Sequence, residues 1–200
     1  KKDISFRLNP LDLPTVNQNR YKVVIDPGHG GPDPGAIGIN GLRETDVVLD
    51  VSLRISRLLE SKGVKVFLTR NKDVDLDLSP RVIKANNLGA NAFVSIHANA
   101  SRGKRKDVNG VETYYYYGSR GLALSRNIHR QLSLVSKGSP DRGVRRARFF
   151  VIRKTNMPAS LVEIGFVTGR LDARRLSQNI HREKVAFAIA KGILNYLKGV

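Results

Sequence analysis

The sequence predicts an α/β fold, with a mostly parallel, twisted sheet of about six strands, helices on both faces and a single domain. Strand-like and helix-like segments alternate along most of the 200 residues, and parallel neighbours need crossover helices. The chain is 40% hydrophobic and 26% charged, as in an ordinary globular domain. No apolar run approaches the roughly 20 residues that a membrane span needs.

The first elements follow an irregular start. Residues 1–20 contain two prolines and no sustained period, so we expect a linker or N-terminal arm there, followed by the domain over residues 21–200. Residues 21–26 read as a strand. Residues 44–63 predict a helix that stops at Gly63, because one face collects the apolar side chains, namely Val47, Val48, Val51, Ile55, Leu58 and Leu59.

The alternation continues to the end of the chain. A short helix is predicted from residue 78 to 89, with Ser79 as its N-cap and Pro80 at its first position. Strands are predicted before and after it, and longer helices later. The remaining strands are expected at 64–70, 91–99, 110–118, 149–153 and 159–166, and the remaining helices at 119–134 and from about residue 180.

Two histidines and two glutamates fall near the ends of predicted strands. His29 follows the first strand, His97 ends the third and Glu163 lies in the last, while Glu44 opens the first helix. Ligands of open parallel sheets bind beyond the carboxyl ends of the strands. Two imidazoles and one carboxylate are the ligands of a catalytic zinc, and a further carboxylate can act as its general base.

The absence of cysteine and the places of the remaining histidines and of Glu112 limit the other sites that the chain could form. The chain has no cysteine, which excludes disulfides and thiolate metal sites. His129 and His181 have charged neighbours and are expected to be solvated. Glu112 alternates with Val111 in a predicted strand, which favours a place on one face of that strand and leaves it as a rival catalytic carboxylate.

Five blocks of the sequence occur in a distinctive order: VVIDPGHGGPDPGAIG, GLRETDVVLDVSLRISRLLESKGVKVFLTR, FVSIHANAS, NGVETYYY and ASLVEIGF. Together they resemble the zinc-dependent N-acetylmuramoyl-L-alanine amidases of bacterial cell walls, the type 3 family, over about residues 21–198. The resemblance implies one Zn²⁺ per domain, held by His29, Glu44 and His97, with Glu163 as the catalytic glutamate.

The resemblance also implies a reaction and a location. The reaction is hydrolysis of the amide between N-acetylmuramic acid and L-alanine of the peptidoglycan stem, in cell-wall remodelling or cell separation. We expect a monomer in the periplasm or the extracellular wall, with any export signal outside this sequence and a preceding wall-targeting domain. Only a helix and a turn are predicted between Tyr117 and Phe149, so we expect no inserted helix that plugs the site.

The formal net charge of +18 predicts attraction to anions, here peptidoglycan carboxylates or anionic wall polymers. Basic clusters at 101–106 and 169–175 follow the strands that bear His97 and Glu163. Arg70, at the end of the second strand, is a candidate for binding a substrate carboxylate. Two alternatives stay open: a zinc peptidase acting within the stem, and a non-catalytic basic wall-binding module. Nucleic acid is not expected, since the tyrosines at 114–117 suit a strand better than a base-stacking surface.

Overall fold

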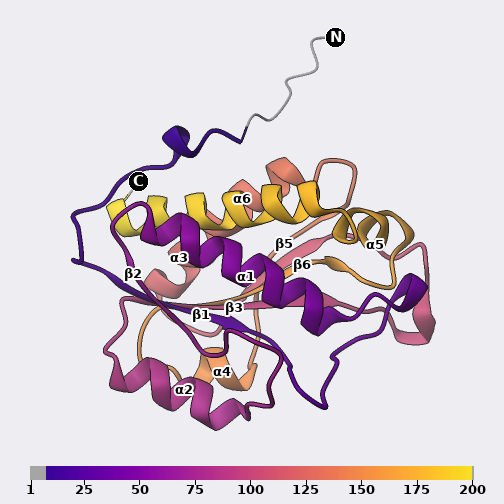
Figure 1. Ribbon diagram of the computed structural model, residues 1–200, viewed down its shortest axis with the longest axis horizontal. Helices are drawn as coiled ribbons and strands as arrows, with labels where there is room; N and C mark the ends of the chain where they lie inside the picture. Colours follow the sequence, from indigo (N-terminus) through magenta and orange to yellow (C-terminus); the bar gives the residue numbers. More distant parts are fainter. Residues whose placement is uncertain (1–7, 200) are drawn as a thin grey trace.

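The computed structural model describes residues 8–199 and places one six-stranded sheet between two layers of helices (Figure 1). The strand order is β2-β1-β3-β6-β4-β5. Within the described chain every neighbouring pair is parallel except β4 with β6. The predicted fold class is confirmed. The strands are β1 (Lys22–Pro27), β2 (Lys65–Leu68), β3 (Ala92–Asn99), β4 (Val111–Tyr115), β5 (Asp141–Arg146) and β6 (Ala159–Phe166).

Helices cover both faces of the sheet, and each face has its own apolar cluster. On one face lie α1 (Glu44–Glu60), α3 (Ser119–Val135) and α6 (Asn179–Lys198), and on the other lie α2 (Leu78–Asn87) and α4 (Phe150–Lys154) (Figure 1). The short α5 (Arg170–Leu176) follows β6. None of the helices in residues 8–199 combines the length and the apolar character that crossing a bilayer requires.

The helix α1 shows why the predicted pattern folds this way. Its residues Val48, Val51, Ile55 and Leu59 recur at helical spacing and are fully buried, which places an apolar stripe against the sheet. The helix ends at Glu60, and Gly63 takes a φ of 91° in the turn that leads to β2. Positive φ suits glycine, which has no Cβ to clash.

One predicted strand is wrong. Residues 150–153 belong to the five-residue helix α4 instead, and Phe149 is its N-cap. The strand that the prediction missed is β5, at residues 141–146. A short apolar run cannot distinguish a strand from a buried helical turn, which explains the first error. The strand β5 lies at the edge of the sheet and carries arginines, as exposed edge strands often carry charges, so it lacks the apolar signal of a central strand.

The described part of the predicted N-terminal arm packs on the domain. Leu13 is only 3% exposed and joins the cluster under α1 and α6. The amide of Val16 donates to the carbonyl of Lys62, and that of Asn19 donates to the carbonyl of Gly63. Residues 1–7 of the predicted arm lie outside the described residues.

Candidate metal centre

Three of the predicted site residues come together at the carboxyl edge of the sheet. Suitable ligand atoms of His29, Glu44 and His97 all lie within 4.8 Å of one another. Glu44 Oε1 lies 3.2 Å from His29 Nε2 and 3.1 Å from His97 Nδ1. Bonds of about 2.0 Å to one tetrahedral ion would separate neighbouring ligand atoms by about 3.3 Å. This donor set therefore fits zinc.

Glu44 is the central residue of this group. It is 5% exposed at the first turn of α1, where the helix dipole favours a carboxylate. Its Oε1 also accepts from the amide of Ala98, and its Oε2 accepts from the amide of Ala36. Burial would raise the pKa of the Glu44 carboxyl, but hydrogen bonds from His29 and His97 outweigh it and hold that pKa well below its usual range. Glu44 is therefore ionised at neutral pH.

Glu163 lies beside this triad on β6, directly in register with His97 on β3. Its Oε2 is buried and has no hydrogen-bond partner among the described residues. Burial raises the pKa of the Glu163 carboxyl to about 7; His97 opposes this rise, and the carboxylates of Glu44 and Glu112 add to it. A carboxyl that titrates near neutrality can both accept a proton and return it.

The loop between β1 and α1 presents His29 in a conformation that is uncommon for residues other than glycine. His29 has a φ of 59°, in the left-handed region that only a few per cent of non-glycine residues adopt, with histidine enriched among them. Its Nδ1 lies 2.7 Å from Asp33 Oδ2, which turns Nε2 toward Glu44. A Cβ at Gly28 would lie 2.3 Å from Cε1 of His97, so only glycine allows the loop to approach β3 this closely.

Two buried arginines, Arg81 and Arg70, donate hydrogen bonds to the backbone of this loop. Arg81 donates to the carbonyls of Pro27 (2.6 Å) and His29 (2.9 Å) and forms an ion pair with Asp26. Asp26 is 1% exposed and also accepts from the hydroxyls of Thr69 and Ser95. This network fixes the backbone of His29 before any ligand binds.

Arg70 takes a different place from the carboxylate-binding role expected for it. The residue is 3% exposed, and its guanidinium donates to the carbonyls of Pro27, Gly28 and Lys72 and to the Thr45 hydroxyl. A buried guanidinium needs acceptors for its five N–H groups, and these carbonyls and this hydroxyl supply them. Arg70 therefore holds the His29 loop, and we assign it no contact with substrate.

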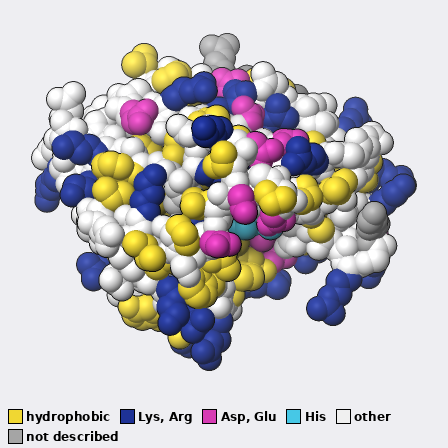
Figure 2. Space-filling model, turned by 60° about the horizontal axis from the view of Figure 1, so that its bottom comes forward, with side chains coloured by type: hydrophobic (Ala, Val, Ile, Leu, Met, Phe, Trp, Pro, Cys, Tyr) yellow, Lys and Arg dark blue, Asp and Glu magenta, His cyan; other side chains and the backbone are white. Residues whose placement is uncertain are grey.

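A cavity of about 350 Å³ opens beside the two histidines. Figure 2 shows histidine at the centre of this face, bordered by Asp and Glu side chains, with Lys and Arg spread around them. The cavity combines apolar and acidic walls, formed among others by Leu78, Phe149, Leu161, Asp75 and Asp77. An extended ligand can therefore lie against the metal centre.

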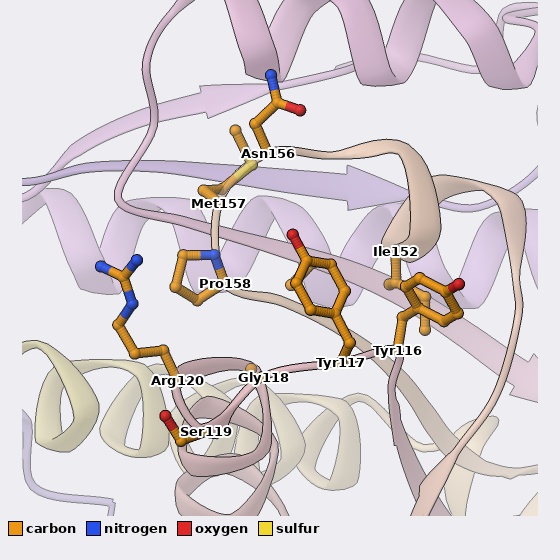
Figure 3. Close-up of a pocket in the computed structure, with 11 residues that line it drawn as sticks. Tyr116, Tyr117, Gly118, Ser119, Arg120, Ile152, Asn156, Met157 and Pro158 are labelled. Atoms are coloured by element: carbon orange, nitrogen blue, oxygen red, sulfur yellow. The ribbon is translucent and has the colours of Figure 1, made fainter.

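A smaller pocket, of about 140 Å³, lies at the opposite edge of the sheet, between the start of β6 and the turn into α3 (Figure 3). Tyr117, Arg120 and Met157 contribute to it, and none of the described residues that line it is a histidine or a carboxylate. This pocket has no part in the metal centre.

Known proteins resemble this chain in sequence and in fold. A model of the N-acetylmuramoyl-L-alanine amidase family matches residues 23–195. This chain belongs to that family. The N-acetylmuramoyl-L-alanine amidase LytC of Bacillus subtilis is 40% identical over 193 residues, which are 95% of this chain and 38% of LytC. The predicted resemblance to cell-wall amidases is thus confirmed.

Solved amidase structures cover almost the whole described domain. The amidase AmiC2 of Nostoc punctiforme has a TM-score of 0.86 and 46% identity, and the match covers 91% of this chain and 99% of that one. The catalytic domain of CwlV from Bacillus (Paenibacillus) polymyxa has a TM-score of 0.84 and 40% identity, with 89% and 98% covered. The fold of this amidase-family chain is therefore that of solved amidases.

The prediction that the other two histidines are solvated is wrong. His129 is 6% exposed, with Nδ1 2.9 Å from the Thr113 hydroxyl and Nε2 2.7 Å from Asp141. His181 is 9% exposed, and burial lowers its pKa to about 4. Their charged neighbours in sequence point elsewhere on the helices. Both histidines are structural.

Metal affinity is expected to rise with pH. Without metal, a hydrogen bond with Glu44 raises the pKa of His29 to about 9 despite burial, with help from Asp33. Metal binding must displace that proton, so apparent zinc affinity should increase up to about tenfold per pH unit below pH about 9. Titrations near roughly pH 6 and pH 8, in buffers of different ionisation enthalpy, measure this proton release. Equal zinc affinities at the two pH values would contradict this prediction.

The raised pKa of His29 makes the metal-free fold less stable as pH rises, whereas it makes zinc affinity increase with pH. The pKa of His29 is about 9 in the folded chain and about 6.5 in an ordinary histidine, so its protonation stabilises the fold fully below pH 6.5. This contribution is lost as pH rises through 9. Metal-free protein should therefore lose part of its stability between these values, as thermal unfolding in a chelator would show.

Proposed function

We propose that this chain is a zinc-dependent amidase that cleaves the bond between N-acetylmuramic acid and L-alanine in peptidoglycan, in the periplasm or the extracellular wall. The observation that carries the proposal is the His29, Glu44 and His97 donor set beside Glu163, whose buried Oε2 has no hydrogen-bond partner among the described residues. Membership of the amidase family supports the choice of bond. When bound by the three ligands, zinc supplies Lewis acidity toward water and an amide carbonyl.

Glu163 carries out the proton transfers in this proposal. Its carboxylate accepts a proton from the attacking water and then donates the same proton to the departing alanine nitrogen. An amine leaves poorly unless it is protonated, so the second transfer matters as much as the first. A pKa of about 7 suits both directions.

Product analysis tests the bond that is cut. Purified peptidoglycan is incubated with the zinc-loaded chain, and the released peptides are identified by mass spectrometry. Intact stem peptides with a free L-alanine amine are the expected product. Shortened stems would instead identify a peptidase, and binding without release would identify a wall-binding module.

No segment of the described chain should plug the metal centre. Between β4 and α4 the described chain contains only α3, β5 and their connections, and both triad histidines keep exposed side chains, 26% for His29 and 20% for His97. The domain alone is therefore expected to cleave purified wall material. Cleavage that appeared only after the segment between β4 and α4 was shortened would contradict this prediction.

The basic clusters support attraction to an anionic wall. The cluster at 101–106 follows β3 and that at 169–175 follows β6, and the amide of Arg170 donates to the carbonyl of Lys106. The two clusters thus adjoin on the side of the sheet that holds the metal centre. Binding to peptidoglycan should weaken steeply as salt rises through about 0.1–0.5 M in a sedimentation assay, because exposed charges are screened. Salt-independent binding would contradict this role.

A further inference from the structure

Glu112 forms an unusual pair with Glu163. The two residues lie directly opposite each other in the antiparallel pairing of β4 with β6, and Glu112 is 4% exposed. Directly opposed residues project to the same face of a sheet with Cβ atoms about 4.5–5.5 Å apart, and like charges there are destabilising. A second buried carboxylate beside the proposed catalytic one therefore needs a physical reason.

The partners of the two carboxylates differ. The Tyr114 hydroxyl donates to Glu112 Oε2, and Arg142 Nη1 lies 3.4 Å from Glu112 Oε1. Arg142 is itself held, since its Nε donates to the carbonyl of Asn109 and its guanidinium lies 4.8 Å from the centre of the Phe166 ring. Both oxygens of Glu112 are thus occupied, whereas Glu163 Oε2 has no partner in the described structure.

We propose that Glu112 is a positioning residue that occupies Arg142 and Tyr114 and so keeps the neighbouring Glu163 carboxylate free for the proton transfers. This inference rests on the proposed role of Glu163. With a neutral side chain at position 112, Glu163 would be the carboxylate left for Arg142 and Tyr114 to contact. An arginine–carboxylate pair is a strong, directional contact. A contact between Arg142 and Glu163 would turn the Glu163 side chain away from the metal centre and weaken Glu163 as a base.

The variant Glu112→Gln tests the proposal. We expect kcat to fall at least about tenfold with KM unchanged, because substrate binding is intact and only the transition state loses its base. Bound zinc should stay at one ion per chain. A crystal structure of this variant should show Arg142 or Tyr114 in contact with Glu163, which is a result independent of activity.

A second variant separates positioning from a merely structural role. Replacing Arg142 as well, in Glu112→Gln/Arg142→Gln, removes the cation that would capture Glu163, so kcat should recover toward the wild-type value. Arg142→Gln alone should retain most of kcat. If Glu112 only supported the fold, the double variant would be at least as impaired as Glu112→Gln. The double variant removes both members of the Glu112–Arg142 ion pair together, so neither is left as an unpaired charge, and the test stays valid even if Glu112→Gln folds poorly.

The outcomes distinguish this inference from the proposed function. Glu163→Gln is assayed in parallel, and Glu183→Gln, an exposed glutamate on α6, is the matched control. An active Glu163→Gln enzyme would overturn the role of Glu163 itself. An inactive Glu163→Gln together with a fully active Glu112→Gln, or a folded and zinc-loaded double variant without recovery, would overturn the role of Glu112 alone.

Discussion

Glu163→Gln is expected to keep its fold and its zinc and to lose turnover on purified peptidoglycan by at least about 10²- to 10⁴-fold. The substitution keeps the size of the side chain and removes the group that accepts and returns the proton, so both transfers are lost together. Glu163 does not belong to the ligand group of His29, Glu44 and His97. Metal analysis and turnover therefore report on separate functions.

The control for this prediction is Glu183→Gln, the same chemical change at an exposed position. Its turnover should equal that of the wild-type chain. A Glu163→Gln enzyme with wild-type turnover would show that Glu163 is not the proton carrier.

His97→Ala is expected to lose bound zinc and, with it, all measurable turnover. In the proposed site His97 supplies one of three ligands, and its Nδ1 lies 3.1 Å from the shared Glu44 oxygen. Removing it leaves two ligands, too few for a stable tetrahedral site. Metal analysis after dialysis should show the loss directly, and added zinc should no longer raise the temperature of unfolding.

His129→Ala is the matched control, since it removes a buried histidine outside the metal centre. It should unfold at a lower temperature, because Thr113 and Asp141 lose their partner, and should still bind one zinc ion. One equivalent of zinc retained by His97→Ala would refute the proposed ligand set.

The sequence predicted the elements that are buried. The helix α1 has an apolar stripe at helical spacing, and the strands β1, β3 and β6 are mostly continuous apolar runs, because the core buries them on both faces. The gathering of His29, Glu44 and His97 was predictable as well, since the carboxyl ends of parallel strands meet at one edge. The edge strand β5 was missed because it does not need an apolar face.

The roles of several charged residues could not be read from the sequence. Arg70 and Arg81 bind mainly backbone carbonyls, and a carbonyl acceptor leaves no trace in residue type. The pairing of Glu112 with Glu163 depends on the antiparallel direction of β4, whereas simple alternation predicts a parallel neighbour. Contacts set by strand direction and loop closure become visible only in three dimensions.

The register between His97 on β3 and Glu163 on β6 also bears on how the protein folds. These strands are distant in sequence, and β1 with its loop must dock on β3 before His29 and Glu44 can meet His97. Such non-local pairings form late and slowly. Zinc should therefore bind tightly only to a chain whose central sheet is complete, so the release of zinc to a chromophoric chelator would report cooperative opening of that sheet in real time.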